Sequence, residues 1–206
     1  MVDIQHVLSN MSTKDVREAL SILSAACATL GVLRYIRLMI WRGKKPERVS
    51  WIIWLVIDAI LTRQMWNAGR LNHQMEAALL GTFLITFATM FYGKRGMGVY
   101  DLLTIGAAAC GVYLWYKSGS DTVGILMSGV VILLGCIPTC LSAWEDPSRE
   151  DLKVWKVFLV SSVLQIIALS SWTLDAATQP IVFLISQIIV IYVIMIRSRV
   201  RVRALA

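Results

Sequence analysis

Seven long apolar segments dominate this chain of 206 residues. About 20 apolar residues in helical conformation cross the hydrocarbon core of a bilayer. Lipid offers no partner to a free backbone amide, so segments of this kind must be helical. The sequence therefore predicts an all-α, polytopic membrane protein with seven transmembrane helices. We place the segments at Ala19–Trp41, Ser50–Trp66, Ala77–Tyr92, Tyr100–Tyr116, Val123–Ala143, Leu152–Trp172 and Ile181–Ile196.

The basic residues lie at the ends of these segments. The formal net charge is +7, but only 16% of residues are charged and 57% are hydrophobic, which argues against nucleic acid as a partner. If the seven segments alternate in direction, thirteen Lys and Arg fall on one side and five on the other. Because basic loops stay in the cytoplasm, the bias predicts an outside amino terminus and a cytoplasmic carboxyl terminus. The thirteen are Arg42, Lys44, Lys45, Arg48, Lys94, Arg95, Arg149, Lys153, Lys156, Arg197, Arg199, Arg201 and Arg203; the five are Lys14, Arg17, Arg63, Arg70 and Lys117.

Part of the sequence returns after 101 residues. Pro46, Arg48, Trp54 and Gln64 correspond to Pro147, Arg149, Trp155 and Gln165. The recurrence predicts two parallel three-helix repeats, which a single linking helix sets in the same orientation. The predicted organisation is an extracytoplasmic segment 1–18, a first repeat 19–92, a linker helix region 93–122, a second repeat 123–196 and a basic cytoplasmic tail 197–206.

Short motifs accompany this three-plus-one-plus-three plan. They are Tyr35-Ile36, Gly43-Lys44-Lys45-Pro46, Ser50-Trp51-Ile52-Ile53-Trp54 and Pro138-Thr139. In plan and in these motifs the chain resembles the SWEET and PQ-loop transporter superfamily, in which a helix, a short basic loop and a Trp-rich helix follow one another. It is also similar to carriers of the nicotinamide riboside type. The resemblance implies a seven-helix carrier. Arg37 stands where the first repeat of the family has proline, and neither repeat has the family's glutamine.

Asp58 lies near the middle of the second apolar segment, where a lone carboxylate is costly. Arg34 lies twelve residues before Pro46 and Asp58 twelve after it. In an antiparallel helix hairpin such residues reach the same depth, so we expect an Arg34–Asp58 ion pair. The pair serves either as a gate or proton-coupling site, or as a structural pair that neutralises two buried charges.

Two aromatic and three amide side chains are further candidates for substrate binding. Trp54 and Trp155 either form two walls of a solute cavity or belong to the belt of Trp at the membrane interface. Gln64, Gln165 and Gln187 need partners inside lipid, either on other helices or on a ligand. Pro138 interrupts the fifth segment and is either a hinge or a static bend.

No residue pattern indicates an enzyme. The chain lacks a Cys-x-x-Cys pair, a His cluster and a glycine-rich phosphate loop, so we expect no metal, no cofactor and no catalytic residues. The first expectation is a carrier for a small polar solute of the sugar, nucleoside or vitamin class. The alternative is a scaffold or sensor that binds another membrane protein. The lipid bilayer is the expected environment, and a homo-oligomer or a membrane protein partner is compatible with either expectation.

Overall fold

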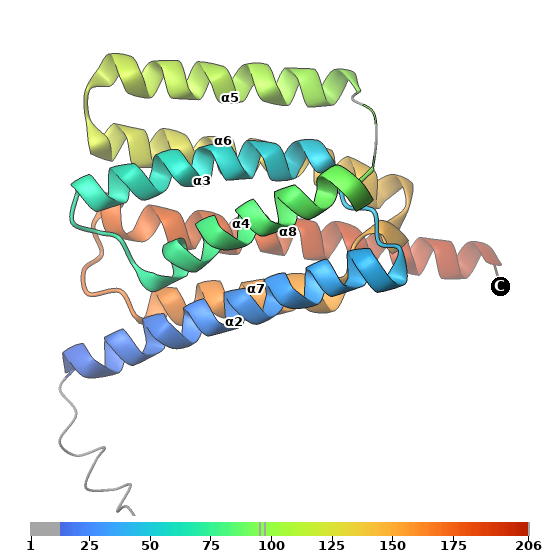
Figure 1. The fold of residues 1–206 in the computed structure, drawn as a ribbon, viewed down its shortest axis with the longest axis horizontal. Helices are drawn as coiled ribbons and strands as arrows, with labels where there is room; N and C mark the ends of the chain where they lie inside the picture. The colour runs from blue at the N-terminus through green and yellow to red at the C-terminus, as the bar shows by residue number, and fades with distance from the viewer. Residues whose placement is uncertain (1–12, 95, 97, 206) are drawn as a thin grey trace, which may run out of the picture.

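The computed structural model describes residues 13–94, 96 and 98–205, with side chains to Val200, and this part of the chain forms seven α-helices and one 3₁₀ turn. Figure 1 shows the helices running side by side. Their bounds are α2 Thr13–Arg42, α3 Arg48–Asn67, α4 His73–Tyr92, α5 Val99–Ser118, α6 Asp121–Glu145, η1 Pro147–Arg149, α7 Leu152–Ile167 and α8 Leu174–Leu205.

Two sets of three helices share one packing order. In the first unit, α2–α4, the third helix packs against both the first and the second. In the second unit, α6–α8, the third helix again packs against the other two. The units meet through α2 against α7 and through α3 against α6, so the first helix of each unit contacts the second helix of the other. Helix α5 packs mainly on α6, at the edge of the bundle in Figure 1.

Polar side chains join the two units at both of these helix contacts. Gln64 on α3 accepts a hydrogen bond from the Ser128 hydroxyl on α6 at 3.0 Å. Gln165 on α7 accepts one from the Ser21 hydroxyl on α2 at 2.9 Å. All four residues are buried. Interhelical hydrogen bonds of this type hold apolar helices in a fixed register, because a buried amide needs a partner.

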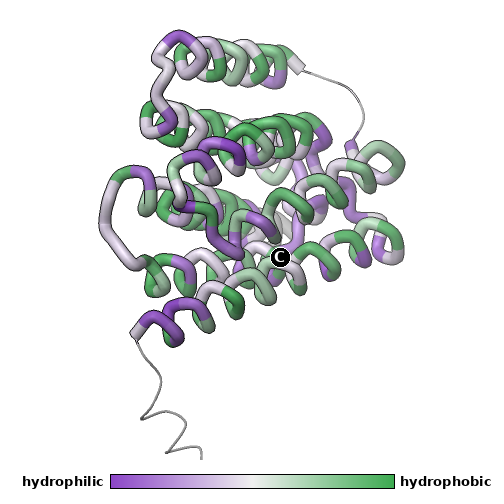
Figure 2. The backbone as a smooth tube through the Cα atoms, turned by 60° about the vertical axis from the view of Figure 1, so that its left-hand side comes forward, coloured by the Kyte–Doolittle hydropathy of each residue, from purple (hydrophilic) through white to green (hydrophobic). Residues whose placement is uncertain are grey.

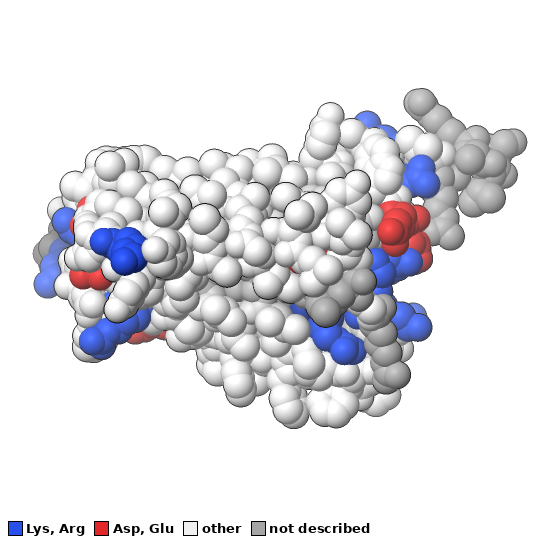
Figure 3. Space-filling model, turned by 90° about the horizontal axis from the view of Figure 1, so that it is seen from above, with Lys and Arg blue, Asp and Glu red and all other residues white. Residues whose placement is uncertain are grey.

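Six of the seven helices are long and apolar enough to cross a membrane. The exception is α7, which has 16 residues and ends at Ile167, five residues before the predicted end of its segment. On the face seen in Figure 3, charged side chains gather at the two ends of the bundle, and the surface between them is uncharged. Hydrophobic residues run along the helices in Figure 2, with many of the hydrophilic ones near turns. The chain is therefore a multi-pass membrane protein in its architecture.

The ends of the chain differ from the sequence-based boundaries. Residues 1–12 of the predicted segment 1–18 lie outside the described residues, and 13–18 already belong to α2. Helix α8 begins at Leu174, seven residues before the predicted start, and Pro180 lies inside the helix. It continues to Leu205, so most of the predicted tail 197–206 is helical. Pro138 also lies within a continuous helix, α6.

Glycines allow aromatic rings to approach the first helix of each unit. A Cβ atom at Gly31 on α2 would lie 2.5 Å from the Phe158 ring on α7. A Cβ atom at Gly135 on α6 would lie 2.6 Å from Nε1 of Trp54 on α3. Small residues at such crossings bring helix backbones and large side chains together. At both contacts between the units, a glycine on the first helix of one unit thus makes room for an aromatic ring of the other unit.

We expect Gly135→Ala to lower the free energy of unfolding by about 1–3 kcal/mol, the usual cost of overpacking a core. The added methyl group would displace the Trp54 ring, whose Nε1–H donates to the Ile132 carbonyl at 3.1 Å. Gly106→Ala is the matched control, because no atom lies within 4 Å of its Cβ position. That substitution should stabilise α5 by about 0.5–1 kcal/mol. Thermal unfolding in detergent measures both, and a shift of the same sign in both variants would contradict the packing at Gly135.

Candidate functional site

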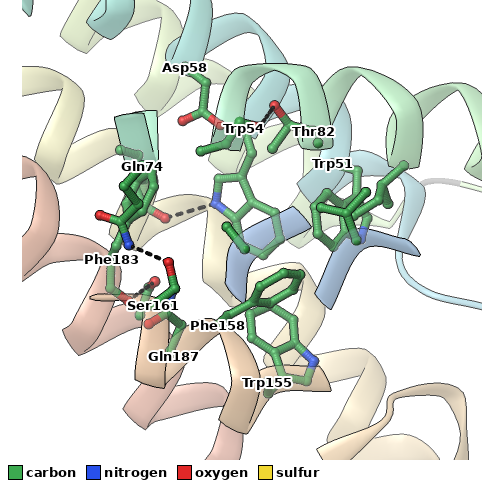
Figure 4. A pocket seen from close by; sticks show the side chains of 17 residues that line it. Trp51, Trp54, Asp58, Gln74, Thr82, Trp155, Phe158, Ser161, Phe183 and Gln187 are labelled. Atoms are coloured by element: carbon green, nitrogen blue, oxygen red, sulfur yellow. Dashed lines mark hydrogen bonds between the residues drawn. The ribbon is translucent and has the colours of Figure 1, made fainter. Parts of the chain in front are cut away.

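A cavity of about 90 Å³ lies at the centre of the bundle, between the two units. Every helix except α5 contributes to its wall, and most of the lining residues are buried. Figure 4 shows these side chains converging from opposite sides. The lining residues are Ala28, Val32, Trp51, Trp54, Asp58, Gln74, Ala78, Gly81, Thr82, Ile85, Ile132, Trp155, Phe158, Ser161, Phe183, Ser186 and Gln187.

Three tryptophans and a phenylalanine form an aromatic wall on one side of this cavity. The Trp54 ring centroid lies 5.0 Å from that of Trp51 and 6.0 Å from that of Trp155. The Phe158 centroid lies 5.9 Å from that of Trp155. The first and last of these contacts are edge-to-face, the arrangement that aromatic quadrupoles favour. Trp54 and Trp155 are therefore cavity residues, 7% and 3% exposed, and the alternative of an interfacial belt is wrong for both.

Asp58 reaches this cavity from the middle of α3 and is 2% exposed. Thr82 on α4 is the hydroxyl side chain that interacts with its carboxyl group. Within the described residues, none of the ion pairs includes Asp58. No Lys, Arg or His is present in the cavity wall. The site therefore offers a carboxyl group that has no basic partner among the residues lining the cavity.

The predicted Arg34–Asp58 ion pair is wrong. Arg34 pairs with Asp151 at the start of α7, with 3.3 Å between Nε and Oδ1. The hairpin argument assumed that α2 and α3 are neighbours along their whole length. Instead α4 packs on both of them, and α7 covers another side of α2. Equal distance from the turn therefore gives similar depth without contact.

Amide and hydroxyl side chains form the polar side of the cavity. The Gln74 amide on α4 donates to Ser161 and Ser162 on α7, at 3.0 and 3.2 Å. Gln179 on α8 donates to the Gln74 carbonyl oxygen at 3.0 Å. With its amide nitrogen turned toward Ser162, Gln187 donates to that hydroxyl at 2.9 Å. These polar groups are therefore largely satisfied by one another.

The five substrate-binding candidates other than Asp58 separate into two sets. Trp54, Trp155 and Gln187 line the cavity, as does Asp58. Gln64 and Gln165 do not, because both lie in the helix contacts between the units. Sequence reasoning missed Trp51, Gln74 and Ser161. The signal for Gln74 was weak, since it lies only two residues after the turn that precedes α4 and resembles a surface residue there.

A buried carboxyl group lies next to the aromatic wall, at the end of the bundle that carries most basic residues. Glu150 precedes α7 and is 2% exposed. Its Oε2 accepts hydrogen bonds from the Tyr35 hydroxyl at 2.6 Å and from Trp155 Nε1–H at 2.9 Å. Lys44 Nζ donates to the Glu150 carbonyl oxygen at 2.6 Å. Because Tyr35 and Lys44 belong to the first unit, this cluster joins the two units beside the cavity.

Burial raises the pKa of Glu150 to about 7, although hydrogen bonds from Tyr35 and Trp155 and the charge of Lys44 oppose the rise. A second buried carboxyl group lies nearby at Glu47, and its charge raises the pKa of Glu150 slightly. Burial also raises the pKa of Glu47, against its ion pair with Lys94 at 3.2 Å. Glu150 therefore changes its charge near neutral pH.

We expect the stability of the protein to fall between about pH 5 and pH 8, and Glu150→Gln to remove part of that fall. The folded state keeps the Glu150 proton to a higher pH than the unfolded chain, where the pKa is 4.5. Its contribution is complete below pH 4.5 and is lost as the pH rises through about 7. Across this pH range, Glu150 should lower the free energy of unfolding by an amount on the order of 3 kcal/mol. Melting temperatures of the parent protein and of Glu150→Gln at about pH 5 and about pH 8 measure this loss of stability.

The exposed carboxylate Glu18 provides the control for this pH experiment. Glu18→Gln should keep the full pH dependence of the parent protein. Glu47 is present in all three proteins, so the difference between them isolates Glu150. Identical pH profiles for the parent and Glu150→Gln would show that Glu150 does not titrate in this range.

Comparison of the chain with protein-family models, with curated proteins and with solved structures gives no match.

Proposed function

We propose that this protein is a carrier for a small polar solute, which it moves by rocking its two three-helix units about the central cavity. The cavity between the units carries the proposal. In carriers built from repeats, the solute site lies near the midplane, where the repeats meet. Here Asp58, near the middle of α3, and Gln187, near the middle of α8, both line a space to which both units contribute.

The parallel repeat is part of this proposal. The shared packing order and the reciprocal contacts of α2 with α7 and of α3 with α6 support it. Residues paired by the 101-residue repeat also have like partners. Gln64 and Gln165 each accept a hydrogen bond from a serine on the first helix of the other unit. Together with α5 as a linker, these features favour a plan similar to that of the SWEET and PQ-loop carriers.

Polar contacts join the units on both sides of the cavity. On one side, Arg70 pairs with Asp175 at 2.9 Å and Asn72 donates to Gln179 at 3.0 Å. On the other side, Glu150 binds Tyr35 and Lys44. Each layer crosses from the first unit to the second. Opening one layer while the other stays closed would expose the cavity to one side of the membrane at a time.

A cysteine introduced at Ala78 tests the proposal in reconstituted vesicles. Cys27, Cys110, Cys136 and Cys140 are first replaced, so that Ala78→Cys supplies the one thiol. A carrier should allow a small membrane-impermeant thiol reagent to label this position from either side of the membrane. Leu61→Cys is the control, because Leu61 is fully buried and does not line the cavity. Labelling from neither side would favour the scaffold or sensor instead.

A further inference from the structure

We propose, on the basis of the proposed carrier function, that the solute is a compact organic ammonium ion. Asp58 would supply its counter-ion and the tryptophans of the cavity would supply its aromatic surroundings. The proposal names the chemical class of the ligand, which the carrier function alone leaves open. It depends on the charge, the aromatic composition, the hydrogen-bonding state and the size of the cavity.

The charge of the cavity selects against anions. Asp58 is the one acidic residue among the lining residues, and no basic residue accompanies it there. A carboxylate that is removed from water and left without a counter-ion is costly. A cationic ligand would stabilise the charged form of Asp58, whereas with a neutral ligand the buried carboxyl group would keep its proton. An anionic ligand would add repulsion to that cost.

The aromatic wall suits an organic cation better than a metal ion. Three indole rings lie with their centroids 5.0 to 6.5 Å apart, and all three line the cavity together with Asp58. Tryptophan is the most favourable aromatic partner for a cation, and rings of this kind recognise quaternary ammonium groups. An alkali or alkaline-earth ion would require about six oxygen ligands. In Figure 4 the Trp54 ring lies between Asp58 and the Trp155 ring.

The remaining polar groups of the cavity leave little for a sugar to bind. Gln74 is engaged with Ser161, Ser162 and Gln179. Gln187 is engaged with Ser162 and with backbone carbonyl groups of Phe183 and Phe158. A polyhydroxylated solute would need several free donors and acceptors at fixed positions, because each buried hydroxyl requires a partner. A methylated ammonium ion requires none.

The size of the cavity limits the ligand to a few heavy atoms. Its volume, taken as the space open to the centre of a water-sized sphere, is about 90 Å³, and one water molecule needs about 10–15 Å³ of such space. A compact headgroup such as that of choline is of the right order, whereas a nucleoside would require the walls to move. The ligand is therefore expected to combine one positive charge with a small apolar surface.

Choline and its uncharged carbon analogue, 3,3-dimethylbutan-1-ol, test the proposal on the purified full-length protein. The two molecules have nearly the same shape and differ in charge. Tryptophan fluorescence and the melting temperature are recorded during titration at constant ionic strength. Choline should give a saturable change in both and bind at least about tenfold more tightly than the alcohol, as expected for an added cation–π and charge interaction.

Two variants in the cavity and one exposed control locate the binding site. Asp58→Asn should weaken choline binding by about tenfold or more. Glu18→Gln, at an exposed position on α2, should bind choline as the parent does. Trp54→Phe keeps a ring at the wall and should weaken binding less than Asp58→Asn. Trp54→Phe keeps the proposal testable if Asp58→Asn disturbs folding.

The outcomes separate this proposal from the carrier function. Equal binding of choline and the alcohol, or an equal response to sodium chloride, overturns the ammonium proposal. Binding of glucose or uridine without binding of choline also overturns it but leaves the carrier function standing. Failure of all these solutes, together with an unlabelled cysteine at position 78, overturns both. Saturable choline binding that requires Asp58, with counterflow of labelled choline in proteoliposomes, supports both.

Discussion

Trp155→Ala is expected to lower the free energy of unfolding by about 3–5 kcal/mol, the range for removal of a buried tryptophan from a core. Trp155 is 3% exposed and packs against the rings of Trp54 and Phe158. Its Nε1–H also donates to Glu150. The substitution therefore opens a void next to the cavity and removes one of the two side-chain donors that stabilise a buried carboxyl group.

Trp66→Ala is the matched control for this prediction. Trp66 lies near the end of α3 and is 66% exposed, so its removal should change the free energy of unfolding by less than about 0.5 kcal/mol. Trp155→Phe separates the two contributions of Trp155, since it keeps an aromatic ring and loses the hydrogen bond. It should cost about 1 kcal/mol. Unfolding in mixed micelles measures all three variants, and equal losses for both alanine substitutions would contradict a structural role of the aromatic wall.

The contrast between these tryptophans shows where sequence reasoning ends. Trp41, Trp66, Trp144 and Trp172 are exposed and lie near helix ends. Trp54 is the seventh residue of its helix and lies in the first half of α3, yet it is buried. Distance from a helix end gives depth along the bundle, but it does not say which face of the helix meets another helix. Only the packing of α3 on α6 decides that Trp54 points inward.

The helices themselves could largely be predicted, because apolar length alone determines them in a membrane protein. Their ends could be predicted less well. Helix α8 begins at Leu174 and includes Pro180 in its second turn, so the apolar segment that starts at Ile181 marks only part of this helix. The order of neighbours could not be predicted at all. The Arg34–Asp58 pair was wrong because the sequence does not show which helices are neighbours. Gln74 was missed for the same reason, since its partners come from α7 and α8.

Asp58→Asn is expected to raise the melting temperature by about 4–8 °C, which corresponds to a gain on the order of 2 kcal/mol for a chain of this size. Asp58 is buried, and in the described part of the chain it belongs to none of the ion pairs. Asparagine has nearly the same shape and can still interact with Thr82. The substitution should therefore remove the cost of a buried charge without leaving a void.

Asp175→Asn should have the opposite effect on the melting temperature, so it is the control for the direction of the change. Asp175 pairs with Arg70 at 2.9 Å and joins α8 to the turn after α3. Loss of its charge should lower the melting temperature. If Asp58→Asn also lowers it, the Asp58 carboxyl group stabilises the fold and the proposed binding role loses its basis.

A rise in stability at Asp58 would carry a functional meaning. A residue that destabilises its own fold persists only if it contributes something other than stability, and binding sites are the usual place for such residues. If Asp58 served packing alone, its replacement by asparagine would not weaken choline binding, because choline would not depend on the charge of this residue. Increased stability combined with weaker choline binding in the same variant would therefore identify Asp58 as a ligand-binding residue, because a merely structural carboxyl group cannot produce both results.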